Sequence, residues 1–348
     1  MISLAKKLPF VALVLIALSS CNHDQSPESK VQQKSYLGTI ITITLYGSVS
    51  DTVFDKIFAR IADIDQKMSA QRIDSEINQV GDAAGDHAVK VSDDTFFVVK
   101  NALEVASNSR NSFDPAIGPI VRLWNIGGTI PHVASDEELA KVLPLVDWRN
   151  INIDEKSHSV YLKKAGMRLD LGGIAKGYAA DEAARICREE NVKSALLDLG
   201  GNILVVGSKP DGSDWKIGIQ DPFAERGNSV GVLSISDQTA VTSGPYERFF
   251  MENGIRYHHI MDPRDGKPAR SGIEQVTLVG SGPSMFADGY TKPCFILGVN
   301  QGLEILKAVP QFEVIFVDDK HHVYMTQEIA KHFRLTNDAF TIEILSRS

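Results

Sequence analysis

The sequence is poor in cysteine, has no excess of positive charge, and contains one apolar run of the length found in targeting segments. Its three cysteines, Cys21, Cys187 and Cys294, form no CxxC pair, so neither a cysteine-based zinc site nor a disulfide framework is indicated. The 36 Lys and Arg residues against 44 Asp and Glu residues give a formal net charge of -8. Nucleic-acid binding depends on clustered Lys and Arg, so the composition argues against a nucleic-acid partner.

The apolar run lies at the N-terminus and is typical of a signal peptide. Lys6 and Lys7 precede "LPFVALVLIAL", and the "LSSC" that ends at Cys21 resembles a bacterial lipobox. We expect residues 1–20 to be a lipoprotein signal peptide, Cys21 to carry the lipid, and the polar residues 21–34 to form a flexible tether. An ordinary secretory signal is the alternative. The protein would then lie in the bacterial cell envelope, anchored on the extracytoplasmic side of a membrane.

The rest of the chain has the 43% hydrophobic content of an ordinary globular core. Helical spacing of apolar residues predicts helices over 51–69, 92–110 and 175–190. Alternation predicts a strand over 36–47, a hairpin over 159–172 and a series of strands after residue 194, with a last helix after Asp288. The predicted fold class is α+β, a single large mixed domain over residues 35–348 with helices early and a largely antiparallel sheet later.

Several loops combine glycine with acidic, hydroxyl or basic side chains. In "LDLGGIAKGYAAD" a strand passes through Gly172 and Gly173 into a helix, so backbone N–H groups and the positive helix end can approach an anion, and Lys176 adds a charge. The segment has neither the GxGxxG nor the Walker A spacing, so standard dinucleotide and P-loop folds are not indicated. A glycine pair before a helix is also compatible with a simple turn.

Taken together, the motifs resemble the ApbE family of FAD:protein FMN transferases. They are "YLGT", "KMSAQRIDSEIN", "SFDPAIGPIVRLW", "LDLGGIAKGYAAD", "LDLGGNI", "TSGPYERFF", "HHIMDPRDGKP" and "FADGYTKPCFILG", in that order. The resemblance covers roughly residues 35–310. It implies an enzyme that binds FAD and Mg²⁺, passes FMN to a Thr or Ser hydroxyl of an acceptor protein, and releases AMP. The implied acceptor is an extracytoplasmic flavoprotein or a subunit of a membrane redox complex.

The resemblance also assigns roles to individual residues. The FAD-binding positions are Leu37, Gln71, Ser112, Phe113, Asp114, Asp170, Lys176 and Ile260. The Mg²⁺ positions are a carbonyl of Gly173, the carboxylate of Asp288, a carbonyl of Thr291, and the family threonine position, which is Lys292 here. Oxygen-only ligands suit Mg²⁺, a hard cation. His259 and Asp288 are the candidates for proton transfer.

Three residues depart from the family pattern. Leu37 stands where Met is usual and Gln71 where Tyr is usual, so ring stacking on the flavin would be lost at Gln71. Lys292 stands where a threonine hydroxyl is usual, and an ammonium group cannot be a metal ligand. Either Thr291 supplies an oxygen after a local shift, or Lys292 takes part of the cation's place and pairs with Asp288 or the pyrophosphate.

These departures leave three alternatives to the transferase. The first is an FAD pyrophosphatase of the same fold, which releases FMN and AMP. The second is a lipoprotein that binds flavin without cleaving it, and the third is a structural lipoprotein that binds no flavin. The sequence contains no Ser/Thr-Gly-Ala-Ser/Thr stretch of the kind this family modifies, so the acceptor is expected to be another protein.

Overall fold

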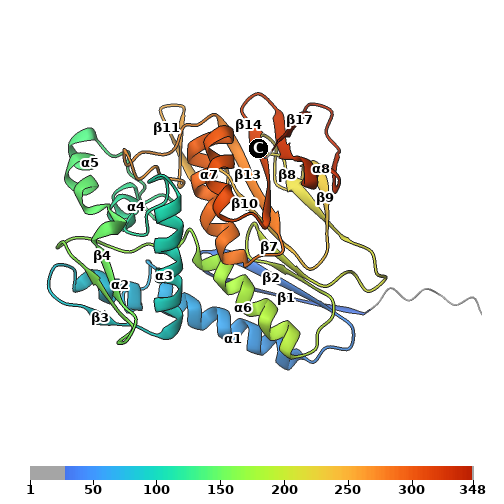
Figure 1. Ribbon diagram of the computed structural model, residues 1–348, viewed down its shortest axis with the longest axis horizontal. Helices are drawn as coiled ribbons and strands as arrows, with labels where there is room; N and C mark the ends of the chain where they lie inside the picture. The colour runs from blue at the N-terminus through green and yellow to red at the C-terminus, as the bar shows by residue number, and fades with distance from the viewer. Residues whose placement is uncertain (1–27, 347–348) are drawn as a thin grey trace, which may run out of the picture.

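A nine-stranded sheet forms the centre of the molecule (Figure 1). The computed structural model describes residues 28–346. The strands follow the order β1 (Ser29–Tyr36), β2 (Thr39–Tyr46), β6 (Ala195–Asp198), β7 (Asn202–Val206), β10 (Thr239–Ser243), β13 (Ile273–Gly280), β14 (Phe312–Asp318), β15 (His322–Thr326) and β17 (Thr341–Leu345). All neighbouring strands are antiparallel except β15 and β17.

Helices cover one face of this sheet. They are α1 (Asp51–Met68), α6 (Ala175–Glu189) and α7 (Ser284–Ile305), and α3 (Asp93–Asn108) packs against α7 and α1. In α1, Val53, Ile57, Ile61 and Ile64 recur at helical spacing and are buried in the core that the helices share with the sheet, and Ser50 caps the N-terminus. Figure 1 shows α1 and α6 side by side below α7, as their mutual packing requires.

The opposite face is covered by a three-stranded sheet and a short helix. These elements are β8 (Trp215–Gln220), β9 (Ser229–Ile235), β16 (Phe333–Leu335) and α8 (Gln327–Ala330). Strand β14 serves both cores, because Val314 and Phe316 pack toward the helices while Ile315 and Val317 pack toward the smaller sheet. Successive side chains of a strand point to opposite faces, so the apolar run of β14 fits a strand buried on both sides.

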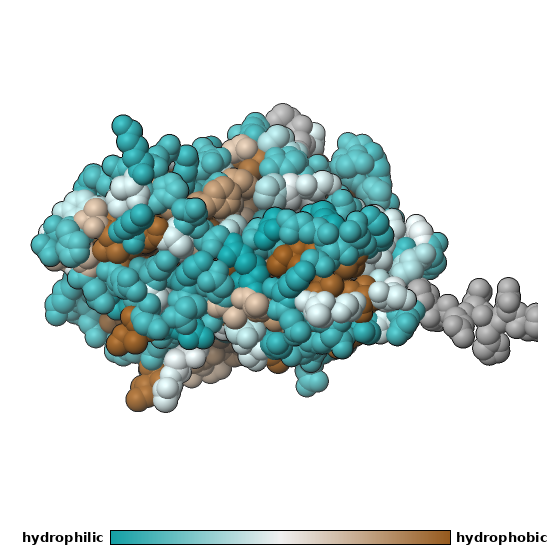
Figure 2. Space-filling model, turned by 90° about the horizontal axis from the view of Figure 1, so that it is seen from below, coloured by the Kyte–Doolittle hydropathy of each residue, from teal (hydrophilic) through white to brown (hydrophobic). Residues whose placement is uncertain are grey.

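The remaining elements lie toward the left of Figure 1 and along the upper edge. They are α2 (Glu76–Asp82), β3 (Val89–Lys90), α4 (Gly118–Trp124), α5 (Asp136–Val142), η1 (Leu143–Leu145), η2 (Trp148–Asn150), β4 (Ile151–Asp154), β5 (Ser159–Leu162), β11 (Phe249–Glu252), β12 (Ile255–His258) and η3 (Leu306–Ala308). Ile120, Trp124, Leu139 and Met261 form a small separate core here. The face in Figure 2 is largely hydrophilic, with apolar side chains in small separate patches, so it presents no large apolar surface.

The structure confirms the α+β class and corrects three local predictions. Residues 29–34, assigned to a flexible tether, belong to β1, because they pair along their whole length with β2. Of the predicted hairpin over 159–172 only Ser159–Leu162 is a strand, and the second predicted strand is reduced to an isolated bridge between Arg168 and Ile117. Helix α7 begins at Ser284, so Asp288 lies inside the helix and not before it.

The predicted lipid attachment at Cys21 and the signal peptide lie outside the described residues. Within residues 28–346, no helix is both long enough and apolar enough to cross a bilayer.

Candidate functional site

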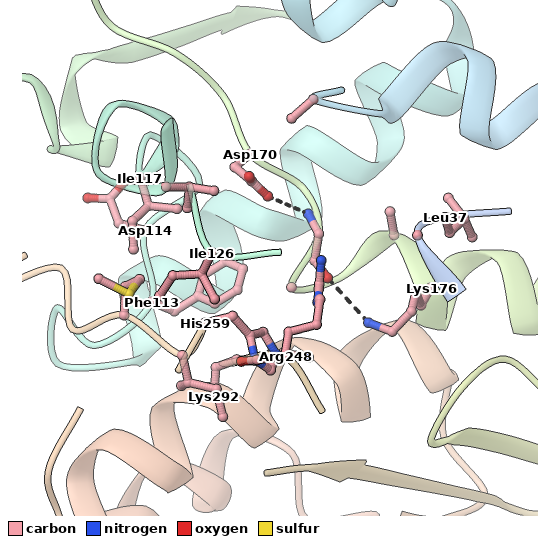
Figure 3. Close-up of a pocket in the computed structure, with 18 of the residues that line it drawn as sticks. Leu37, Phe113, Asp114, Ile117, Ile126, Asp170, Lys176, Arg248, His259 and Lys292 are labelled. Atoms are coloured by element: carbon pink, nitrogen blue, oxygen red, sulfur yellow. Dashed lines mark hydrogen bonds between the residues drawn. The ribbon is translucent and has the colours of Figure 1, made fainter. Parts of the chain in front are cut away.

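A cleft that is partly open to solvent gathers nearly all the predicted site residues. Its walls come from the turn between β1 and β2, the end of α1, the loop before α4, the start of α6 and one turn of α7 (Figure 3). The predicted residues that line it are Leu37, Gln71, Ser112, Phe113, Asp114, Asp170, Gly173, Lys176, His259, Ile260 and Lys292. Asp288 and Thr291 do not line it, because both are fully buried beneath its wall.

A cluster of one carboxylate and two ammonium groups lies at the start of α6. The Asp288 Oδ1 atom accepts a hydrogen bond from Lys292, and Oδ2 lies 3.6 Å from the Lys176 Nζ atom. The backbone N–H of Gly177 donates to the same Oδ2 over 3.0 Å. Burial alone would raise the pKa of Asp288, but the charges of Lys176 and Lys292 outweigh it and the pKa lies below its ordinary value. Asp288 therefore remains a carboxylate.

Lys292 carries the second ammonium group of this cluster. Its Nζ also donates to the backbone carbonyl of Asp288 over 3.0 Å. Burial lowers the pKa of Lys292 to about 8, with Asp288 opposing the change and Lys176 adding to it. The side chain is therefore mostly protonated at neutral pH, and its positive charge faces the cleft.

The glycines of this region permit close approach of the surrounding groups. A Cβ at Gly177 would lie 2.4 Å from the carbonyl oxygen of Ser284, so only glycine lets α6 and α7 meet here. A Cβ at Gly173 would lie 3.0 Å from the ring of Phe113. Gly172 donates its N–H to Asp170 over 2.8 Å and accepts from Lys176 over 3.3 Å, as the dashed lines in Figure 3 show. The loop before α6 is thus held by side chains that also line the cleft.

The turn between β1 and β2 places Leu37 at the cleft. Leu37 and Gly38 have φ angles of 53° and 69°, the left-handed pair that a two-residue hairpin turn requires. Such a conformation is strained for leucine, and the Asp65 carboxylate stabilises it by accepting the N–H of Leu37 over 3.0 Å. Gln71 also lines the cleft, but it is exposed and only its backbone N–H makes a hydrogen bond, to Ser69.

The loop before α4 contributes the ring of Phe113 and the buried carboxylate of Asp114 to the cleft. The Ser112 hydroxyl donates to the carbonyl of Ser109, so it holds the turn. Asp114 accepts the backbone N–H groups of Ala116 and Trp148 over 2.8 and 2.9 Å. Burial raises the pKa of Asp114 to about 6, with these hydrogen bonds opposing it. Asp114 therefore ties the two loops together, and its carboxylate is negative at neutral pH.

His259 is the imidazole that reaches the cleft. Its Nδ1 lies 3.2 Å from the carbonyl oxygen of Arg248, and a carbonyl only accepts, so Nδ1 carries the proton and Nε2 keeps a lone pair. Burial, together with the charge of Arg248, holds the pKa of His259 well below its ordinary value. The neighbouring His258 has a structural role, because it donates to Ala269 and accepts from Ile260. His259 is therefore a neutral proton acceptor.

Arg248 lines the cleft but was given no role in the sequence analysis, although it lies within the motif "TSGPYERFF". Its side chain lies close to two turns, with NH1 3.9 Å from the Cβ position of Gly38 and Cδ 3.5 Å from that of Gly127. Figure 3 places it beside His259. The motif contains Arg248, but the place of its side chain in the cleft depends on the turns at Gly38 and Gly127, more than a hundred positions away. A local sequence pattern cannot predict such a contact.

The side chains at the predicted Mg²⁺ site do not fit a divalent cation. One Asp288 oxygen is bonded to an ammonium group and the other lies between an N–H and a second ammonium group. The Thr291 hydroxyl, the oxygen that a local shift would have to supply, lies 2.8 Å from both Ser243 Oγ and the Asp288 carbonyl, away from the cleft lining. No cluster of three His, Cys, Asp or Glu side chains suited to a metal occurs in residues 28–346.

Comparison with known proteins identifies the family. The sequence pattern of the ApbE family matches residues 37–316. The chain belongs to the ApbE family. A relative from Klebsiella pneumoniae (strain 342) is 35% identical over 83% of this chain and 89% of its own length. One from Treponema pallidum (strain Nichols) is 30% identical over 97% of this chain and 98% of its own length. Both are named FAD:protein FMN transferase.

Solved ApbE structures confirm the fold. The crystal structure of the ApbE protein from Thermotoga maritima has a TM-score of 0.82 at 27% identity, covering 88% of this chain and 100% of that one. The flavin transferase ApbE from Vibrio cholerae has a TM-score of 0.78 at 25% identity, over 88% and 99%. The α+β architecture predicted from the spacing of apolar residues is therefore that of the ApbE family.

Proposed function

We propose that this protein transfers FMN from FAD to a Thr or Ser hydroxyl of an acceptor protein and releases AMP. The observation that carries the proposal is the cleft itself, where the Gly172–Gly173 loop, three basic side chains and a neutral His259 converge. A pyrophosphate is an anion suited to such a site. The names of the relatives from Klebsiella pneumoniae and Treponema pallidum support the same activity.

The chemistry divides between charge stabilisation and proton transfer. The acceptor hydroxyl oxygen attacks the phosphorus of the FMN half, a new P–O bond forms, and the bond to the bridging oxygen breaks with its electron pair leaving on AMP. Lys176, Lys292 and Arg248 stabilise the negative charge on the phosphoryl oxygens. The Nε2 atom of His259 takes the proton of the attacking hydroxyl. Asp288 is unsuited to that step, because it is buried behind the cleft lining and two ammonium groups lower its pKa, so its affinity for a proton is small.

The resemblance also implied Mg²⁺, which would neutralise phosphate charge when bound. We include no step through a metal, because the oxygens of Asp288 are already engaged by cations.

The test is a single incubation of the protein with FAD and a candidate acceptor bearing a Ser/Thr-Gly-Ala-Ser/Thr stretch. We expect AMP in solution and an acceptor heavier by one FMN moiety, measured by chromatography and mass analysis. Free FMN in the presence of a competent acceptor would indicate the pyrophosphatase instead, and unchanged FAD would indicate a protein that only binds flavin.

The location proposed from the sequence is the extracytoplasmic face of a membrane, with lipid on Cys21. The acceptor would then be an extracytoplasmic flavoprotein or an exposed subunit of a membrane redox complex. Labelled fatty acid should be incorporated into the wild type, and Cys21→Ser should lose the label and move to the soluble fraction. A labelled Cys21→Ser variant, or an unlabelled wild type, would contradict the anchor.

A further inference from the structure

The Asp288 carboxylate is fully buried and has cations as its main partners. Lys292 bonds to one oxygen, and Lys176 lies 3.6 Å from the other, which also accepts the Gly177 N–H over 3.0 Å. A buried carboxylate is stable only when its charge is compensated and its lone pairs are satisfied. Both conditions are met here by groups of the chain itself.

The position of Lys292 follows from helix geometry. Residues four apart lie on the same face of a helix, so α7 places the Lys292 side chain directly over Asp288. Lys292 lines the cleft and Asp288 does not. The Cε atom of Lys292 lies 3.9 Å from the Cβ position of Gly173, whose carbonyl was predicted to bind Mg²⁺. The ammonium group therefore covers the Asp288 oxygen on the side of the cleft where a cation would have to arrive.

We propose that the Lys292 ammonium group takes the place of a divalent cation, so that the cleft binds and activates the FAD pyrophosphate without Mg²⁺. The identity of the ligand rests on the function proposed above. One carboxylate and two ammonium groups leave the buried cluster with one net positive charge, and Arg248 adds another beside it. A divalent cation at Asp288 would meet two like-charged groups and would have to displace one of them.

The wild-type protein gives the first test. AMP release from FAD and quenching of flavin fluorescence on FAD binding should be the same, within about twofold, in excess EDTA and in millimolar Mg²⁺. Calorimetric titration with MgCl₂ alone should show no binding. Strict dependence of AMP release on Mg²⁺, or stoichiometric Mg²⁺ binding by the wild type, would overturn the proposal.

Substitution of the lysine gives the second test. In Lys292→Thr the charge is lost and the hydroxyl usual in the family is restored. We expect FAD binding in EDTA to weaken roughly tenfold or more, the effect of losing a charged hydrogen bond. Added Mg²⁺ should now bind and restore FAD binding. Lys292→Arg should stay independent of metal, and Lys307→Thr, outside the cleft on η3, should behave as the wild type.

A further substitution, Lys292→Gln, separates the loss of the charge from a loss of folding. Lys292→Gln keeps a donor toward Asp288 and removes the charge, so it should fold, as judged by circular dichroism, while FAD binding in EDTA weakens. If Lys292→Gln binds FAD as tightly as the wild type, the charge has no role and the proposal is wrong.

The design separates failure of this proposal from failure of the proposed function. AMP release that requires Mg²⁺ contradicts the metal-free site and leaves the transferase standing. No AMP release in either condition contradicts the transferase. In that case metal-free FAD binding that weakens in Lys292→Gln still supports the ammonium site, and absence of FAD binding overturns both.

Discussion

Replacing Gly177 by alanine tests whether the contact between α6 and α7 supports the site. Alanine in a helix is ordinarily about 1 kcal/mol more favourable than glycine. Here a Cβ would lie 2.4 Å from the Ser284 carbonyl oxygen and 2.5 Å from the Met285 Cα atom. Both neighbours are backbone atoms, so no side-chain rotation relieves the overlap, and the helices must separate by about 1 Å to restore ordinary contact.

The separation is opposed by hydrogen bonds between the two helices. Asp181 on α6 accepts the N–H groups of Ser284 and Met285 over 2.7 and 2.9 Å, and these bonds cap the start of α7. Overpacking of a rigid contact costs about 3 kcal/mol, the upper part of the usual range. After subtracting the gain in helix propensity, we expect Gly177→Ala to lower the free energy of unfolding by about 2 kcal/mol.

Urea unfolding followed by circular dichroism measures this difference. FAD affinity should fall as well, because the Gly177 N–H holds Asp288 beneath the cleft. Gly289→Ala is the matched control on α7, since its nearest neighbour is a Val105 methyl at 3.0 Å, which can turn away, and its loss should be smaller. A Gly177→Ala protein as stable as the wild type would refute the reasoning.

Three further substitutions test the ion pair between Asp94 on α3 and Arg60 on α1, and the roles of His259 and Arg248 in the cleft. Asp94→Asn should lose about 2 kcal/mol at pH 7, between the values for exposed and buried pairs. Hydrogen bonds from Arg60 hold the pKa of Asp94 below its ordinary 3.8. The contribution of Asp94 to the free energy of unfolding is therefore complete above pH 3.8 and is lost in more acidic solution, where the urea-unfolding curves of the wild type and Asp94→Asn should converge. A difference between the two curves that stays constant with pH would contradict this. Burial and the charge of Arg248 lower the pKa of His259, so AMP release should not fall as the pH drops through 6.5. His259→Gln should slow AMP release about 100-fold at unchanged FAD affinity. A loss of activity at pH 6.5, or no effect of the substitution, would exclude His259 as the base. Arg248→Met should raise the KM for FAD roughly tenfold with a smaller change in kcat. The control is Arg256→Met on β12, because Arg256 packs on the ring of Phe249 outside the cleft, and its KM should not change. Equal effects of the two substitutions would show that Arg248 does not bind FAD.

The parts of the fold that were predictable are those with a local signal. Helix α6 was predicted within one residue of its observed end, because apolar residues recur at helical spacing between a glycine pair and polar residues. The start of α7 carried no such signal. Its N-cap residue, Pro283, makes no side-chain cap, and the capping carboxylate comes from Asp181, 103 positions away from Ser284. The local sequence therefore suggested a turn where a helix had already begun.

Strand β1 shows a second limit. An internal strand has an alternating or continuous apolar pattern, but β1 is an edge strand and its side chains are mostly exposed, so its sequence is as polar as a linker. Its pairing with β2 is made by the backbone, which the side-chain pattern does not report. Most of the predicted site residues line one cleft, because whole motifs carried them, whereas their mutual contacts, such as Lys292 with Asp288, had to come from the structure.

Under the metal-free proposal, the contact between Asp288 and Lys292 also explains why an acidic residue is needed at this position. A buried lysine alone tends to lose its proton, and a buried carboxylate alone tends to gain one. Each keeps the other ionised here, and Lys176 adds the charge that makes the cluster net positive. If Asp288 were lost, two ammonium groups would face each other without compensation. Asp288 is therefore required for a lysine-based anion site as much as for a magnesium site, so its presence does not distinguish the two, and the residue four positions later does.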